Sequence, residues 1–168
     1  MVPVSPQNVK ELREKTGAGV MDCKKALDAA AGDIEKAASM LKEKGLARAQ
    51  AKAERVASQG LVEAYVHPGG RLAALVELNC ESDFVARTDA FKELAHNLAM
   101  QVAACAPTCI SRDDVPAGVE VNPEEACLLL QPFIKDPTKT VSDLVIATAA
   151  TTGENVKVRR FARFELGK

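Results

Sequence analysis

The chain has 168 residues, of which 47% are hydrophobic and 27% charged, a composition typical of one globular domain or of one domain with a small appendage. Its 22 basic and 23 acidic residues give a formal net charge of −1, so global charge does not indicate a nucleic-acid-binding or membrane-surface protein. With one Tyr, five Phe and no Trp, the core must be built mainly from Ala, Val and Leu. In a chain with so few aromatic residues, an exposed Phe would be unusual.

No apolar run approaches the roughly 18–20 residues that span a bilayer, and the start of the chain lacks a basic segment followed by an apolar one. These features predict a cytoplasmic protein. Five scattered cysteines, mostly flanked by apolar residues, indicate reduced, buried thiols rather than a disulfide framework. Cys105 and Cys109 lie four apart, but no second pair completes a zinc site, so we expect no metal.

Three short helices open the chain. Ser5 is placed to cap a helix that begins at Pro6, and the residues from Thr16 to Gly19 end it. The second helix carries its buried face on Cys23, Ala26, Leu27 and Ala30, and the third, capped by Asp33, carries its own on Ile34, Ala37, Ala38 and Leu41 up to Gly45. Residues 1–45 are therefore expected to form a three-helix module suited to recognition rather than catalysis.

Residues 46–59 are rich in Ala, Lys and Arg with little apolar periodicity, which predicts a solvated helical linker. The apolar period then changes to two. We expect Val62, Ala64 and Val66 to form the apolar side of one strand, followed by a Pro68-Gly69-Gly70 turn and a second strand. The second strand places Leu72, Ala74, Val76, Leu78 and Cys80 on the same apolar face of a hairpin.

Residues 60–168 are predicted to form an α+β core. A long helix carries Phe91, Leu94, Ala95, Leu98, Val102 and Cys105 on one side. Shorter helices are expected after Asn122 and after Asp136-Pro137, where Thr140 and Asp143 have the spacing of a capping box. The alternating segment 156–166 is a returning strand, so the core should contain a three-stranded antiparallel sheet packed against helices.

Sequences typical of nucleotide-binding loops and hydrolase sites are absent, so no direct nucleotide binding is expected. Cys80 with His67 or His96 is the one pairing that a thiol enzyme could use, although Cys80 lies on the apolar side of its strand. Basic residues alternate with Phe161 and Phe164 on the last strand, which favours a partner or dimer surface over a nucleic-acid platform.

Two apolar features are not needed by the core. Val20 and Met21 open the second helix outside the apolar stripe set by Cys23, so we expect them to face outward. Phe84 follows Asp83 on a charged turn between a strand and a helix. It is either a lid on the core or a wedge for a partner's pocket.

At these positions the chain resembles the elongation factor Ts family. Residues 9–27 (VKELREKTGAGVMDCKKAL) resemble the first signature of that family, and residues 79–86 (NCESDFVA) resemble the second, with Ser82 where Thr is usual. Further matches at residues 100–104, 133–136 and 153–156 follow in the same order. The resemblance thus covers essentially the whole chain.

The resemblance implies a guanine-nucleotide exchange factor for elongation factor Tu that uses no cofactor. In the family, a module similar to a ubiquitin-associated domain docks on the GTPase, and Arg13, Val20 and Met21 match its contact region. The Asp-Phe motif, here within Ser82, Asp83, Phe84 and Val85, is placed near the Mg²⁺ and phosphates, which it disturbs. A binding adaptor, in which a ubiquitin-associated-like module is joined to an unrelated α+β domain and has no exchange activity, remains an alternative, as does the thiol enzyme.

Longer members of the family carry a second copy of the core subdomain, and this chain is expected to be a short, single-core form. Short members are thought to pair two cores through their sheets. The last strand, with Arg159, Phe161 and Arg163 and with Phe161 expected to be exposed, is then a candidate dimer or partner strand. The implied assembly is a homodimer that binds two GTPase molecules.

Overall fold

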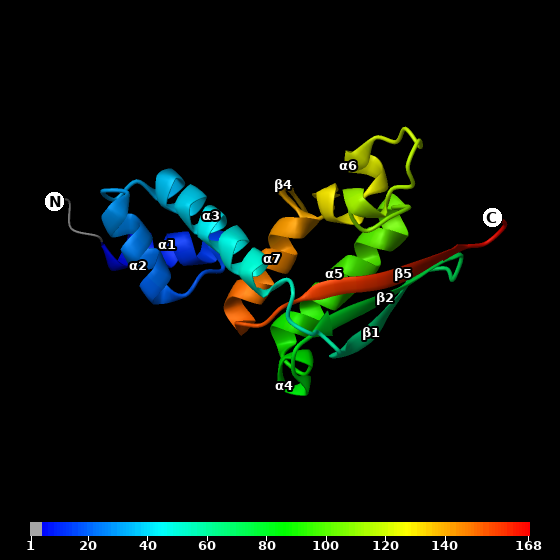
Figure 1. The fold of residues 1–168 in the computed structure, drawn as a ribbon, viewed down its shortest axis with the longest axis horizontal. Helices are drawn as coiled ribbons and strands as arrows, with labels where there is room; N and C mark the ends of the chain where they lie inside the picture. Colours follow the sequence, from blue (N-terminus) through cyan, green and yellow to red (C-terminus); the bar gives the residue numbers. More distant parts are fainter. Residues whose placement is uncertain (1–4) are drawn as a thin grey trace. The chain divides into compact units, whose positions relative to one another are not determined.

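A computed structural model describes residues 5–168, apart from the side chains of residues 49 and 50. The chain divides into two compact units: unit 1 ends at Arg55 and also includes Ile146–Asn155, and unit 2 comprises Val56–Val145 and Val156–Lys168. Each unit is drawn in Figure 1. None of the described helices is both long and apolar enough to cross a membrane.

Unit 1 is helical. It contains α1 (Pro6–Thr16), α2 (Val20–Ala29), α3 (Ile34–Lys52) and most of α7 (Val141–Thr152). Ser5 caps α1 by accepting the Asn8 N–H at 3.1 Å, which satisfies one of the otherwise unpaired N–H groups of the first turn. The predicted stripes meet in one core, whose buried members are Leu12, Cys23, Ala26, Leu27, Ala30, Ala37 and Leu41. The three-helix module is confirmed.

The predicted end of the third helix at Gly45 is wrong, because α3 continues to Lys52. Glycine weakens a helix interior by about 1 kcal/mol relative to alanine, but here it makes room for a neighbouring helix. A Cβ at Gly45 would lie 3.2 Å from Cγ2 of Ile146 in α7. Close packing of α7 thus accounts for a glycine that, in the sequence, looks like a helix end. The division into residues 1–45, 46–59 and 60–168 stays a prediction.

Unit 2 is an antiparallel sheet covered by a helix. The sheet order is β1-β2-β5, formed by β1 (Gln59–Val66), β2 (Leu72–Cys80) and β5 (Lys157–Glu165). Helix α5 (Asp89–Cys105) lies across one face of this sheet (Figure 1). Val76 and Leu78 of β2 and Leu94 and Leu98 of α5 are buried between them. The predicted α+β fold with a three-stranded sheet is confirmed.

Smaller elements complete unit 2. They are α4 (Asp83–Ala86), two 3-10 turns η1 (Arg112–Asp114) and η2 (Leu128–Leu130), α6 (Pro123–Ala126), and the short strands β3 (Pro132–Phe133) and β4 (Asp136–Thr140). Buried Gln101 of α5 holds this region, since its amide donates to Oε1 of Gln131 and its Oε1 accepts the Ile134 N–H. The predicted capping box is present, because Thr140 and Asp143 exchange side-chain to N–H bonds of 3.2 and 3.0 Å.

The predicted apolar face of the hairpin is correct for β2 and wrong for β1. Val62, Ala64 and Val66 are exposed, whereas the alternate residues of β1 are half-buried. Val62 lies opposite Glu77, and Val66 lies opposite Ala73. Since residues directly opposite each other point to the same side of a sheet, Val62 and Val66 lie on the face away from α5. An alternating pattern fixes which residues share a face, but not which face is buried.

Candidate functional site

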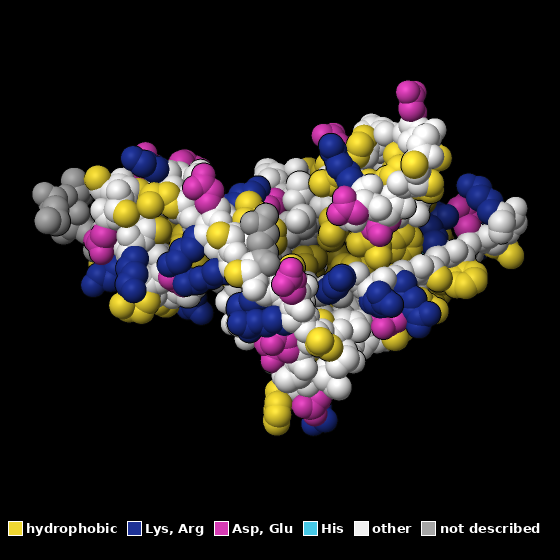
Figure 2. All heavy atoms as spheres, in the orientation of Figure 1, with side chains coloured by type: hydrophobic (Ala, Val, Ile, Leu, Met, Phe, Trp, Pro, Cys, Tyr) yellow, Lys and Arg dark blue, Asp and Glu magenta, His cyan; other side chains and the backbone are white. Residues whose placement is uncertain are grey.

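The turn between β2 and α5 presents a phenylalanine to solvent. Ser82 caps α4 by accepting the Val85 N–H, and Val85 and Ala86 are buried. Phe84 points the other way and is 77% exposed. Figure 2 shows hydrophobic atoms beside charged side chains at α4. Of the two interpretations left open by the sequence, the lid on the core is wrong, and an exposed apolar side chain on an anchored turn remains.

Asp83 lies beside Phe84 and already has an ion-pair partner. Its Oδ2 is 2.8 Å from Nη2 of Arg87, one helical turn further on. The Arg87 side chain is largely exposed and the Asp83 side chain about half exposed, and solvent-accessible pairs of this kind contribute only about 0–1 kcal/mol. An incoming partner could therefore break the pair at little cost and take over the carboxylate of Asp83.

A second exposed apolar site lies at the start of α2. Val20 is 52% exposed and Met21 63% exposed, which confirms that they face outward. Gly17 precedes them with a φ of +68°, and its N–H donates to the carbonyl oxygen of Arg13 at 2.8 Å. Such a left-handed helix cap favours glycine. The cap ends α1 and begins the turn that leads to α2. The side chain of Arg13, in the last turn of α1, is exposed.

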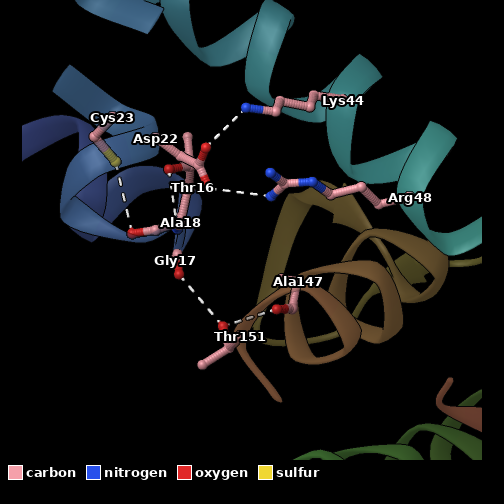
Figure 3. A network of polar contacts seen from close by, with 9 residues as sticks. All are labelled: Thr16, Gly17, Ala18, Asp22, Cys23, Lys44, Arg48, Ala147 and Thr151. Carbon is pink, nitrogen blue, oxygen red and sulfur yellow. Dashed lines mark hydrogen bonds and ion pairs between the residues drawn. The ribbon is translucent and has the colours of Figure 1, made fainter. Parts of the chain in front are cut away.

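Asp22 ties the start of α2 to α3. Its two carboxylate oxygens bind Nζ of Lys44 at 2.8 Å and Nη1 of Arg48 at 3.0 Å (Figure 3). Hydrogen bonds to Lys44 and then Arg48 lower the pKa of the Asp22 carboxyl, because both cations favour its charged form. Sequence reasoning missed this residue, although the basic side chains one turn apart at positions 44 and 48 were a visible signal.

Further bonds order the turn between α1 and α2 (Figure 3). Thr16 donates its hydroxyl to the carbonyl oxygen of Leu12 at 2.7 Å, and it accepts the Ala18 N–H at 3.3 Å. Thr151 of α7 donates to the carbonyl oxygen of Gly17 at 3.4 Å. Together with Asp22, these contacts hold the backbone on both sides of Val20 and Met21, so the apolar pair is displayed from an ordered frame.

The face of the sheet away from α5 is a third apolar surface, which we call the outer sheet face. Its exposed apolar members come from all three strands and the residue that follows β5: Val62, Ala64, Val66, Leu75, Ala162, Phe164 and Leu166. Single exposed apolar residues are normal on proteins, but a contiguous group indicates an interaction site. Sequence reasoning missed this group because β1 was assigned to the wrong side.

The three residues of β5 that were predicted to form a dimer or partner strand differ in their exposure. Phe161, expected to be exposed, is half-buried on the side of Val76, and the exposed aromatic of the strand is Phe164 instead. Arg163 is also turned inward, with Nε donating to the carbonyl oxygen of Ala103 at 3.0 Å. Arg159 is exposed at a break in the β2–β5 register.

The geometry gives no support to a thiol enzyme. Cys80 is fully buried and donates to the carbonyl oxygen of Ser82 at 3.1 Å. Both imidazoles bind elsewhere, because His67 contacts the Tyr65 hydroxyl and His96 contacts Oε1 of Glu63, each through Nδ1. Among residues 5–168, no group of three or more His, Cys, Asp or Glu side chains is placed to hold a metal ion.

Comparison with known proteins identifies the family. A family model described as elongation factor TS matches residues 6–124. The elongation factor Ts of Thermoanaerobacter sp. (strain X514) is 51% identical over 98% of this chain and 96% of its own length. The elongation factor Ts of Carboxydothermus hydrogenoformans is 49% identical over 98% of this chain and 90% of its own. That of Finegoldia magna is 47% identical, over all of this chain and 92% of its own. The chain therefore belongs to the elongation factor Ts family, a family of translation elongation factors.

Proposed function

We propose that this protein is a guanine-nucleotide exchange factor that binds elongation factor Tu in the cytoplasm and promotes release of its GDP. The observation that carries the proposal is Phe84, an aromatic side chain that is 77% exposed on a turn anchored by buried neighbours. Aromatic residues, Phe among them, are enriched at protein interfaces relative to the rest of the surface. Membership in the elongation factor Ts family supports the choice of partner.

In the proposed mechanism Phe84 enters an apolar pocket of the GTPase and Asp83 engages its polar groups near the Mg²⁺ and phosphates. Ser82 and Val85 support the turn, through the helix cap and through burial respectively. Thr88 adds to this support, because its hydroxyl donates to the carbonyl oxygen of Val85 at 2.8 Å. A wedge on a fixed base loses little conformational entropy when it docks.

The start of α2 supplies a second contact in this proposal. Met21 and Val20 would pack on the nucleotide-binding domain of the GTPase, while Arg13 adds a cation next to them. Little backbone needs to be ordered on binding, because the Asp22 contacts with Lys44 and Arg48 already hold the helix start. This surface would contribute affinity, whereas the Asp83-Phe84 turn would act on the nucleotide site.

Exchange of this kind involves no covalent step and no cofactor. If the factor binds nucleotide-free elongation factor Tu more tightly than the GDP-bound form, linkage requires that it weaken GDP binding by the same factor. Each tenfold weakening needs about 1.4 kcal/mol of differential binding. One buried aromatic side chain supplies an amount of that order. The protein would therefore act as a binding partner rather than as an enzyme.

We further propose that two copies pair through the outer sheet face and that the dimer binds two GTPase molecules. Leu75 lies in the central strand of this face, and its neighbours across the sheet are Ala64 and Ala162. Small side chains around a central leucine leave space for the sheet of a second copy. Arg160 and Glu77 of this face form an ion pair through Nε and Oε2 at 2.6 Å, and exposed Lys157 lies opposite Asn79 at its other end.

Release of fluorescently labelled GDP from elongation factor Tu, measured by stopped flow with and without this protein, tests the function. A dissociation rate that rises with the concentration of the protein and then saturates supports exchange activity. A binding adaptor would form a complex with the GTPase and leave the GDP dissociation rate unchanged, which would refute the proposal.

A further inference from the structure

Cys109 and Cys127 are brought side by side by the backbone of unit 2. They form a parallel bridge in which the Leu128 N–H donates to the carbonyl oxygen of Cys109 at 2.9 Å. The Cys109 N–H in turn donates to the carbonyl oxygen of Ala126 at 3.1 Å. The two cysteines are 18 positions apart in the sequence, so the fold rather than local sequence makes them neighbours.

The two sulfur atoms are in direct non-bonded contact. The Cys109 thiol donates to Sγ of Cys127 over 3.2 Å. Paired strands are about 4.8 Å apart, which falls inside the roughly 4.4–6.8 Å between Cα atoms that a disulfide requires. Closing the S–S bond therefore needs side-chain rotation and little backbone movement.

We propose that Cys109 and Cys127 form an oxidisable dithiol, a modification site that a peroxide converts into an intramolecular disulfide. This inference does not depend on the proposed exchange activity. Within residues 5–168 no third metal-binding side chain joins the two cysteines, which favours oxidation over metal binding at this place.

The exposure of the two thiols assigns their roles. Cys109 is partly exposed, whereas Cys127 is fully buried, so Cys109 meets the oxidant. Its thiolate attacks hydrogen peroxide, and a hydroxide ion leaves, giving the sulfenic acid. The sulfur of Cys127 then attacks the sulfenic sulfur; hydroxide leaves and takes up the Cys127 proton as water. Two thiols and one peroxide molecule thus give one disulfide and two water molecules.

The surroundings make this dithiol slow to react at neutral pH. Burial and then the adjacent Cys127 thiol raise the pKa of Cys109 to about 11, and the carboxylate of Asp114 adds to the rise. The reactive thiolate is therefore scarce near pH 7. Oxidation should become faster as the pH increases toward that value, which gives the site a signature different from that of an ordinary exposed thiol.

The disulfide would close the loop that runs from η1 to α6. Ser111 and Asp114 already order one end of this loop, since both the N–H and the hydroxyl of Ser111 donate to Oδ2 of Asp114 at 2.8 Å. Asn122 caps the other end by accepting the Glu124 N–H. Because both ends are ordered in the reduced protein, the bond would form within the native structure rather than require its rearrangement.

The experiment exposes the folded 168-residue chain to hydrogen peroxide at pH 7 and pH 9, followed by non-reducing digestion and mass spectrometry. Cys105 is exposed, so a Cys105→Ser background removes the competing thiol. The expected product is a crosslinked peptide pair containing Cys109 and Cys127, with a mass lower by two hydrogen atoms and a rate that is higher at pH 9. Reductant should restore the original mass.

Cys127→Ser in the same background is the matched variant. It keeps Cys109 but removes the resolving sulfur, so its product should gain oxygen atoms instead of losing hydrogen. A Cys109–Cys127 crosslink that is absent after the thiols have been consumed would overturn the proposal. So would a crosslink that forms only once the protein has been unfolded in urea, because the native geometry would then play no part.

Discussion

At the scale of single residues, burial separates side chains that the sequence presents as equivalent. Phe91 and Phe84 both belong to the segment after β2, yet Phe91 is fully buried and Phe84 is exposed. Periodicity predicted the first, because Phe91 begins the apolar stripe of α5. It left the second undecided, since a four-residue helix has no periodic face. Apolar periodicity therefore did not place the side chain that carries the proposed function, and the family resemblance alone favoured an exposed position.

Phe84→Ala is expected to slow the stimulated release of GDP at least about tenfold, since truncating a central interface aromatic costs more than about 1.4 kcal/mol. The free energy of unfolding should change by less than about 0.5 kcal/mol, as is usual for exposed positions. Stopped-flow release and urea unfolding give the two values. Val119→Ala, which truncates another exposed apolar side chain, is the control and should leave release unchanged. Normal release with Phe84→Ala would remove this residue from the mechanism.

Asp22 gives a pH-dependent prediction. Its pKa is lowered in the folded state by Lys44 and Arg48, so its stabilising contribution is present above the unfolded pKa of about 3.9 and is lost as the pH falls through the folded value. Asp22→Asn should lower the free energy of unfolding at pH 7 by less than about 1 kcal/mol, because the pair is partly exposed.

The difference in unfolding free energy between wild type and Asp22→Asn should shrink below about pH 4. Urea unfolding at pH 7, 5 and 3 measures it. Asp28→Asn, on the exposed side of the same helix, serves as the matched control. A difference that stays constant from pH 7 to pH 3 would show that the ion pairs of Asp22 do not contribute in the folded protein.

At the scale of elements, the sheet is the place where prediction from sequence was half correct. The turn at Pro68-Gly69-Gly70 and the alternation identified both strands of the hairpin, and the buried side of β2 was correct. The buried side of β1 was wrong because Glu63 and Tyr65 lie on the helix side. There Glu63 contacts His96 at 3.0 Å and the Tyr65 ring packs edge-on against that imidazole. Polar residues that pair in this way can occupy a covered face. The alternation of apolar and polar residues in β1 therefore does not show which side of the strand is buried.

The outer sheet face predicts a specific dimer-breaking variant. Leu75→Lys would bury an unpaired ammonium group between two sheets, which costs several kcal/mol, so dimer affinity should fall at least about a hundredfold. Light scattering coupled to size-exclusion chromatography measures the mass across a concentration series. Val119→Lys makes an equivalent change on a loop, so its mass by light scattering should match that of the wild-type protein at each concentration. A wild-type protein that remains monomeric throughout the series would contradict the proposed dimer.

At the scale of the whole molecule, sequence reasoning predicted the fold class, the helical module and the exposure of Val20 and Met21. It did not predict the continuation of α3 past Gly45, because the packing of Ile146 of α7 against that glycine is a long-range contact. Nor did it predict the Cys109–Cys127 bridge, which depends on two loop segments meeting. Local patterns predict elements, whereas contacts between distant segments decide helix ends, strand faces and thiol pairs.

The proposed function depends on differential binding, and one measurement tests it directly. The dissociation constant of this protein should be determined, by titration calorimetry, for nucleotide-free elongation factor Tu and for the same GTPase saturated with GDP. Exchange by the proposed mechanism predicts much tighter binding to the nucleotide-free form, by the same factor as that by which the protein weakens GDP binding. Equal affinity for the two forms would contradict the proposal, because a protein that binds both forms equally does not shift the equilibrium between GDP-bound and nucleotide-free elongation factor Tu.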